Sequence, residues 1–166
     1  MAKRVEIDGW TSGLRFSACH IIPGHEKCGR LHGHSYAVHI RIIGKPNEKH
    51  IIADFGFIKG ILREICDELD HKVILPQDNR DLKVNVEGGK VHVTMGKKEY
   101  SFPEEDVIIL DIPSATAEAL ARYILDKIAP IIMSNNLEEI DLGLDEGVGQ
   151  GAWAKNTYSH GYQSNY

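Results

Sequence analysis

The chain has 166 residues, of which 42% are hydrophobic, and a formal net charge of −5 at pH 7. This length predicts one domain over residues 1–166, and the acidic balance argues against non-specific binding to nucleic acid. No apolar run approaches the roughly 20 residues that a membrane-spanning helix needs. With no signal-peptide pattern and no disulfide framework among three cysteines, we expect a cytoplasmic protein without a nucleic-acid or membrane partner.

The first half of the chain predicts two strands and a helix. Val5 to His20 and His34 to Gly44 alternate apolar and polar residues, so we expect them to pair as antiparallel strands. From Phe55 to Leu69 apolar residues recur at steps of three and four, which predicts a helix with Asp54 as its N-cap.

An insert is expected from about 73 to 106. Leu82–Val86, Val91–Met95 and Tyr100–Phe102 alternate around a Gly-Gly pair at 88–89, which predicts a hairpin. This insert is interpreted as a surface elaboration, an edge for subunit contact, or a lid.

The last part of the chain predicts two strands and a second helix. The apolar run Val107–Leu110 indicates a buried strand, and a helix is expected from Thr116, with Pro130 kinking or ending it. Ile140 to Leu144 alternates as a final strand, and the polar tail over 154–166 is expected to be disordered.

Three histidines lie at the ends of apolar strand faces. His32 and His34 are two residues apart, and His20 ends the alternating row of the preceding strand. If the two strands pair, three imidazoles meet at one end of a shared face, and three neutral nitrogen ligands suit zinc. Each histidine alone could instead be a half-buried residue with a hydrogen-bond partner. His25, in the connecting loop, is interpreted as a solvated side chain.

Whether such a zinc site is structural or catalytic depends on the role of Cys28. As a fourth ligand it would close a structural site, whereas a free thiol leaves a position open, as in catalytic sites. Lys27 and Arg30 flank Cys28 and favour a thiolate that acts as base or nucleophile, although an inert loop thiol is the alternative. Together with Lys59, these cations could receive a phosphorylated substrate; singly, each is a solvated charge.

Two further positions carry unusual carboxylates. Glu146 continues the apolar row of the last strand, so it either faces solvent beyond the strand or is a buried acceptor for two adjacent N–H donors. Asp70 precedes His71 at the end of the first helix, which is either a helix-end pair or a proton relay with Cys28.

These residues resemble the 6-pyruvoyl-tetrahydropterin synthase family. The three-residue gap between Cys28 and His32 is similar to the 6-carboxytetrahydropterin synthase branch of 7-deazaguanine (queuosine) biosynthesis. The likeness lies in motifs that follow one another in order: Phe16–His20, Cys28–Tyr36, Asp54-Phe55 with Lys59, Leu69–His71, Pro113–Glu118 and Glu146.

The resemblance implies an α+β tunnelling fold, with a four-stranded antiparallel sheet, two helices on one face, and the hairpin insert added. It also implies a homohexamer, a dimer of trimers with sites at subunit interfaces. The residue roles that it implies are zinc (Zn2+) ligands at His20, His32 and His34, a catalytic relay of Cys28, Asp70 and His71, and a pterin anchor at Glu146.

The implied activity is that of a zinc-dependent lyase. It would convert 7,8-dihydroneopterin triphosphate to 6-carboxytetrahydropterin, releasing acetaldehyde and triphosphate. Alternatives are the 6-pyruvoyl product, or a 6-hydroxymethylpterin with Glu26 in the role of the cysteine. Outside this chemistry, the chain could be a structural zinc protein or a pterin- or purine-binding module. Gly147 departs from the family, whose members usually have threonine after the anchoring glutamate.

Overall fold

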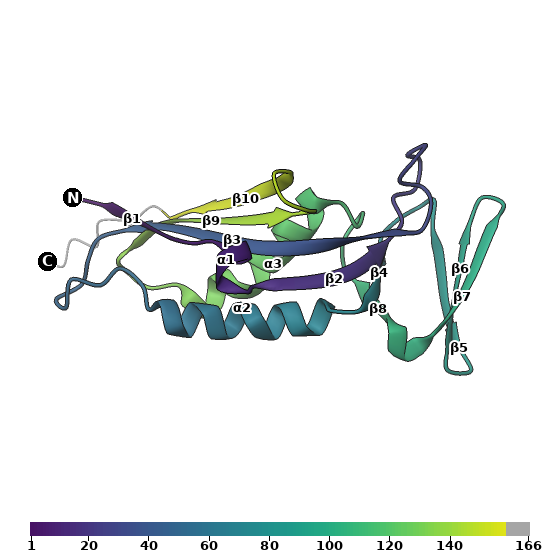
Figure 1. Ribbon diagram of the computed structural model, residues 1–166, viewed down its shortest axis with the longest axis horizontal. Helices are drawn as coiled ribbons and strands as arrows, with labels where there is room; N and C mark the ends of the chain where they lie inside the picture. Colours follow the sequence, from purple (N-terminus) through teal and green to yellow (C-terminus); the bar gives the residue numbers. More distant parts are fainter. Residues whose placement is uncertain (159–166) are drawn as a thin grey trace, which may run out of the picture.

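A seven-stranded sheet runs along the molecule, and two helices lie on one of its faces (Figure 1). The computed structural model describes residues 1–158. The strands follow the order β10-β9-β3-β2-β4-β8, with β1 also paired to β3. Their bounds are β1 (Lys3–Ile7), β2 (Arg15–His20), β3 (His32–Gly44), β4 (Lys72–Pro76), β8 (Val107–Leu110), β9 (Leu137–Asp145) and β10 (Gly151–Thr157).

The α+β class is confirmed, and a four-stranded antiparallel sheet is present as β10-β9-β3-β2. The sequence did not predict β10 as one of its strands, and the predicted strand Val107–Leu110 (β8) lies outside this antiparallel part. Two strands extend it in parallel, β4 beside β2 and β8 beside β4. β4 was expected to belong to the insert, which in fact begins after Pro76. Ile74 packs in the main core and Leu75 in a second core on the other face. A strand buried on both faces shows no alternation, so the sequence pattern did not reveal it.

The expected single strand from Val5 to His20 is wrong. It is divided into β1 and β2 by the short helix α1 (Gly9–Ser12). The Asp8 side chain accepts a hydrogen bond from the Thr11 amide and caps this helix. Gly9 lies so close to β3 that a Cβ atom would come within 2.3 Å of the Val38 carbonyl oxygen, so the chain can turn there only at a glycine.

Helices α2 (Phe55–Leu69) and α3 (Ala117–Ile132) cover the sheet with their apolar sides. The side chains of Asp54 and Thr116 cap the N-termini of α2 and α3 by accepting hydrogen bonds from the amides of Phe57 and Ala119. The sequence predicts this cap for Asp54. Pro130 lies within the last turn of α3 and the helix continues to Ile132. No helix of residues 1–158 is both long and apolar enough to cross a membrane.

The insert is a separate three-stranded sheet at one end of the molecule (Figure 1). It consists of β5 (Lys83–Glu87), β6 (Lys90–Met95) and β7 (Lys98–Pro103), followed by the 3-10 turn η1 (Glu104–Asp106). The hairpin predicted at Gly88-Gly89 joins β5 to β6, with both glycines at positive φ. Leu82, Val91 and Val93 pack on Leu75 of β4 and fix the insert to the sheet.

The tail was expected to be disordered from Ala154. Residues 154–157 instead form the second half of β10 and pair with β9. The amide of Tyr158 then donates to the Glu138 carbonyl oxygen. The remainder of that expectation concerns residues 159–166, which lie outside the described part of the chain.

Candidate metal centre and its surroundings

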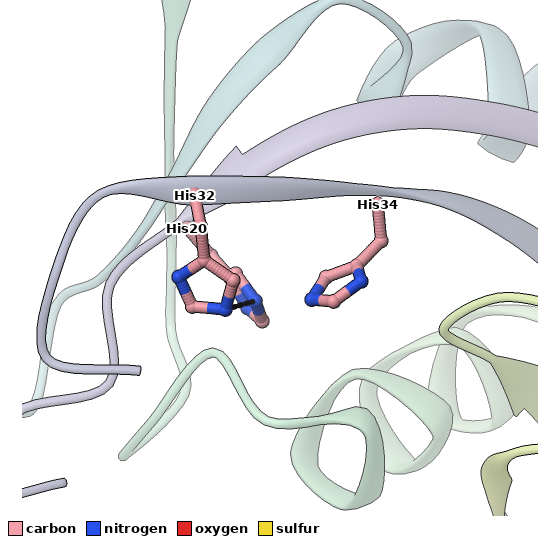
Figure 2. Close-up of side chains that lie close together, drawn as sticks. All are labelled: His20, His32 and His34. Carbon is pink, nitrogen blue, oxygen red and sulfur yellow. Dashed lines mark hydrogen bonds between the residues drawn. The ribbon is translucent and has the colours of Figure 1, made fainter. Parts of the chain in front are cut away.

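The pairing of β2 with β3 brings three imidazoles together. His20 lies opposite His32 in the ladder, and His34 follows two residues further on the same face. Figure 2 shows all three rings hanging from the two strands toward one space. One ring nitrogen from each lies within 4.8 Å of those of the other two, so the group could hold a metal ion. The predicted convergence is confirmed.

Backbone carbonyls orient two of the rings. The Nδ1 atom of His20 lies 2.6 Å from the Ala115 carbonyl oxygen, and that of His32 lies 2.7 Å from the Arg30 carbonyl oxygen. A carbonyl only accepts, so each Nδ1 must carry the proton and each Nε2 presents a lone pair. The two Nε2 atoms are 3.1 Å apart. Two lone pairs at this distance repel each other, and a cation between them removes the repulsion.

Burial keeps His20 in the neutral state that a metal ligand requires. Its ring is fully buried, and desolvation lowers the pKa of His20 to about 4. The hydrogen bond with Ala115 opposes this shift, while the positive charge that His32 and His34 could carry lowers the pKa further. At neutral pH His20 therefore binds no second proton and remains available to a metal ion.

Glu146 is half-buried beside the histidines and does not simply face solvent. Its Oε1 atom is buried, has no hydrogen-bond partner in the described part of the chain, and lies 4.0 Å from Nε2 of His20. Desolvation raises the pKa of Glu146, against the opposing effect of His34, and Glu118 in the first turn of α3 raises it further. An unpaired buried carboxylate oxygen is costly. Its position next to the histidines indicates a ligand group with N–H donors.

A tight turn explains the glycine that follows this carboxylate. The Glu146 amide donates to the Gln150 carbonyl oxygen and closes the turn. Gly147 has φ 108° and Gly149 has φ 88°, a region that side-chain-bearing residues rarely adopt. The departure from the expected threonine therefore reflects the local backbone of this chain.

The Cys28 thiol is free and half-buried in the loop between β2 and β3. It does not belong to the group of three histidines whose ligand atoms lie within 4.8 Å of one another. The closed site with cysteine as fourth ligand is therefore not formed, and the open arrangement is favoured.

His25 has a role in this loop that the sequence did not reveal. Its Nδ1 atom accepts a hydrogen bond of 3.0 Å from the Cys28 amide, and its carbonyl oxygen accepts one of 2.8 Å from Gly29. The His25 side chain is exposed and is not one of the grouped metal-ligand candidates, as predicted, but it also orders the loop. The three-residue spacing to Cys28 was the available signal, since it is the spacing at which a side chain caps a turn.

Asp70 and His71 pair with each other, as expected. The carboxylate Oδ2 of Asp70 lies 2.8 Å from Nδ1 of His71, and its Oδ1 accepts a hydrogen bond of 2.7 Å from the Ser17 amide. That backbone hydrogen bond, followed by the one with the His71 side chain, lowers the pKa of Asp70. The His71 side chain is 84% exposed and its backbone has φ 57°.

This pair lies on the other face of the sheet from the metal centre. His71 borders an open cavity of about 710 Å³ that runs along β2 and β3. Its lining from these strands consists of Ser17, Cys19, Gly33 and Ser35, together with Ala18 and His34. The side chains of Ser17, Cys19 and Ser35 decide which face the cavity lies on. These positions point away from the face that carries His20 and His34. Among residues 1–158 no hydrogen bond or ion pair joins Asp70 or His71 to Cys28, so the predicted relay is not formed within one chain.

The expected group of cations is also not assembled. Lys59 belongs to the second turn of α2. The start of this helix lies away from the β2–β3 loop, which carries Lys27 and Arg30 (Figure 1). Those two residues are exposed in the loop itself. A phosphate site made from all three is therefore wrong for one chain.

Comparisons with known proteins agree on one family. The family model described as 6-pyruvoyl tetrahydropterin synthase matches residues 11–157. A protein of Methanocaldococcus jannaschii, provisionally named a 6-carboxy-5,6,7,8-tetrahydropterin synthase, is 43% identical over 152 residues, covering 89% of this chain and 93% of the relative. The 6-carboxy-5,6,7,8-tetrahydropterin synthase of Rickettsia felis is 32% identical and covers 72% of this chain and 79% of its own length.

Solved structures show the same fold. The 6-pyruvoyl tetrahydropterin synthase of Plasmodium falciparum superposes with a TM-score of 0.88 at 26% sequence identity, covering 95% of this chain and 99% of that chain. The Plasmodium vivax enzyme of the same name gives a TM-score of 0.88 at 24% identity. The high coverage shows that the likeness extends through the insert, and the tunnelling fold expected from the sequence is confirmed.

Loss of one imidazole should remove metal. We expect His32→Ala to weaken binding of a divalent ion by more than the roughly 10–100-fold loss caused by removing a group that only orients a ligand. Plasma mass spectrometry after dialysis against a metal buffer measures this. His92→Ala, which removes an exposed histidine of the insert, is the control. Equal metal content in His32→Ala and the unmodified protein would contradict the assignment.

Proposed function

Because the chain belongs to the 6-pyruvoyl tetrahydropterin synthase family, we propose that it is a zinc-dependent lyase. Its substrate would be 7,8-dihydroneopterin triphosphate, and its products 6-carboxytetrahydropterin, acetaldehyde and triphosphate. The observation that carries this proposal is the group of three histidines, of which His20 is fully buried, with a Glu146 oxygen beside it that has no hydrogen-bond partner among residues 1–158. The names of the relatives in Methanocaldococcus jannaschii and Rickettsia felis support the carboxy product.

Zinc fits the donor set of His20, His32 and His34. Three neutral nitrogens leave a fourth position open, and the Cys28 thiol does not occupy it. When bound, zinc would supply Lewis acidity for the hydroxyl groups of the substrate side chain. The protein's own part is to orient the ligand rings, and the carbonyl groups of Ala115 and Arg30 do this for His20 and His32.

Glu146 would anchor the pterin ring. An aminopyrimidinone presents two adjacent N–H donors, and a carboxylate accepts both in a paired geometry. The buried Oε1 atom of Glu146 has no hydrogen-bond partner within residues 1–158. Binding of such a ring would offset the free-energy cost of burying this carboxylate.

Cys28 would act as the base that removes a proton from the substrate. Its peptide group is held by Ile22, whose amide donates to the Cys28 carbonyl oxygen at 2.9 Å, and by the ring of His25. Such positioning of a reacting group contributes strongly to rate.

Asp70 and His71 would serve a site completed by another subunit. They lie on the opposite face from the histidines of their own chain, and His71 is exposed beside an open cavity. The homohexamer that the family resemblance implies, with sites at subunit interfaces, would bring this pair to a neighbouring Cys28. The cytoplasmic location remains a prediction.

The 6-pyruvoyl product is the second candidate, favoured by the description of the matching family and by the Plasmodium falciparum structure. To distinguish the two, zinc-loaded protein is incubated with 7,8-dihydroneopterin triphosphate while acetaldehyde is trapped. We expect acetaldehyde and 6-carboxytetrahydropterin in equal amounts by mass spectrometry. A pyruvoyl or hydroxymethyl product would move the chain to another activity, and unchanged substrate would contradict the proposed enzyme.

Removal of the proposed base should separate chemistry from metal binding. We expect Cys28→Ala to retain zinc, since the thiol is not among the grouped ligands, and to lose about 100-fold or more in kcat, as expected for loss of a general base. Zinc content and single-turnover rates check this. Full activity of the variant, or loss of its zinc, would show that the assigned role is wrong.

Glu146→Gln should weaken recognition of the pterin. The amide offers one acceptor in place of two, so we expect kcat/KM to fall roughly 100-fold, or about 2–3 kcal/mol. Zinc content should stay unchanged because Glu146 is not one of the three grouped ligands. Steady-state kinetics measure the change, and an unaltered kcat/KM would remove Glu146 from substrate binding.

A further inference from the structure

The insert touches the reactive loop through one lysine. The Nζ atom of Lys98 donates a hydrogen bond of 2.6 Å to the Gly29 carbonyl oxygen, although the two residues are 69 positions apart. Gly29 directly follows Cys28. We propose that Lys98 is a positioning residue that holds the Cys28 loop in place for the reaction. This inference rests on the proposed function of Cys28.

The other hydrogen bonds of the Cys28-Gly29 segment come from within the loop. The Cys28 amide donates to the His25 ring, its carbonyl oxygen accepts from Ile22, and the Gly29 amide donates to the His25 carbonyl oxygen. These bonds fold the loop on itself but do not tie it to the rest of the molecule. In the described part of the chain, Lys98 supplies the one hydrogen bond that reaches this segment from outside the loop.

The loop is packed too closely to accept a substitute for Gly29. A Cβ atom there would lie 2.4 Å from the His25 carbonyl oxygen. A small displacement of Gly29 is transmitted to Cys28, because the two residues share a peptide bond of fixed geometry.

The insert provides a fixed base for Lys98. Lys98 begins β7 and pairs with Met95 of β6 across the turn at Gly96 and Lys97, and Gly96 has φ 60°. The buried valines of β6 anchor this hairpin on Leu75 of β4. In Figure 1 the β6–β7 hairpin stands beside the loop that joins β2 to β3, at the same end of the molecule. The insert, which packs on β4, thus holds the loop between β2 and β3 through the Lys98–Gly29 hydrogen bond.

The charge of Lys98 makes this contact stronger than an ordinary surface hydrogen bond. A donor that carries a charge forms shorter and stronger hydrogen bonds than a neutral one, and this contact is partly buried. A reacting group displaced by about 1 Å can lose about 100-fold in rate. Loosening of the loop should therefore lower kcat while leaving the pterin and metal contacts unchanged.

The test uses Lys98→Met, with Lys98→Arg as the conservative variant and Lys97→Met as the matched control. Lys97 occupies the same turn, and residues 1–158 show no hydrogen bond or ion pair for its side chain. In zinc-loaded protein we expect Lys98→Met to lower kcat about tenfold with KM nearly unchanged, as loss of one charged hydrogen bond predicts. Arginine should restore most of the rate, and Lys97→Met should behave as the unmodified protein.

A second readout does not depend on turnover. Hydrogen exchange of the Ile22, Cys28 and Gly29 amides should accelerate about tenfold in Lys98→Met, since these are the amides that the closed loop protects. Unchanged exchange would overturn the positioning role, whatever the activity. A raised KM with unchanged kcat would also overturn it and show that Lys98 contacts substrate. If the unmodified protein turns nothing over, the proposed function fails while the exchange result still decides the role of Lys98.

Discussion

The structure depends on the register between β2 and β3. His20 lies opposite His32, and a shift of one residue would turn one set of imidazoles to the other face of the sheet. The same register is fixed by core packing, since the rings of Phe16 and Tyr36 stack at 4.7 Å between centroids. Gly33 adds a steric limit, because a Cβ atom there would lie 2.8 Å from the Ala18 carbonyl oxygen. The same packing that fixes the core between β2 and β3 therefore fixes the relative positions of the three histidines.

The fixed strand register has a free-energy cost at the metal centre, because it holds polar groups in unfavourable positions. The Nε2 lone pairs of His20 and His32 face each other at 3.1 Å, and a buried carboxylate oxygen of Glu146 has no hydrogen-bond partner among the described residues. Burial raises the pKa of Tyr36, next to these groups, and the Glu146 charge raises it further. Such conflicts of local interactions occur where function requires them. A cation among the imidazoles and N–H donors at Glu146 would resolve both conflicts, so the empty site is less stable than the filled one.

Alternation along strands explains why much of the site was predictable. It placed three histidines on one face and Glu146 at the end of the apolar row of β9, and the structure confirms that these groups converge. It could not place Asp70 and His71, because their side of the sheet depends on the parallel pairing of β4 and on the left-handed backbone of His71. The contact of Lys98 with Gly29 joins residues far apart in the chain, and no local pattern signals such a contact.

The insert contributes to the position of the Cys28 loop and is not an independent surface addition. It leaves the sheet directly after β4, the strand that follows His71, and returns through β8. Val73 and Leu75 of β4, with Val107 and Ile109 of β8, contact its core, so both parallel strands are covered on two faces as such strands require. One continuous segment thus carries the Asp70-His71 pair at its start and Lys98 near its end. The core around Leu75 therefore fixes the position of two features at once. One is the start of β4, which follows Asp70 and His71, and the other is the β6–β7 hairpin, from which Lys98 contacts the Cys28 loop.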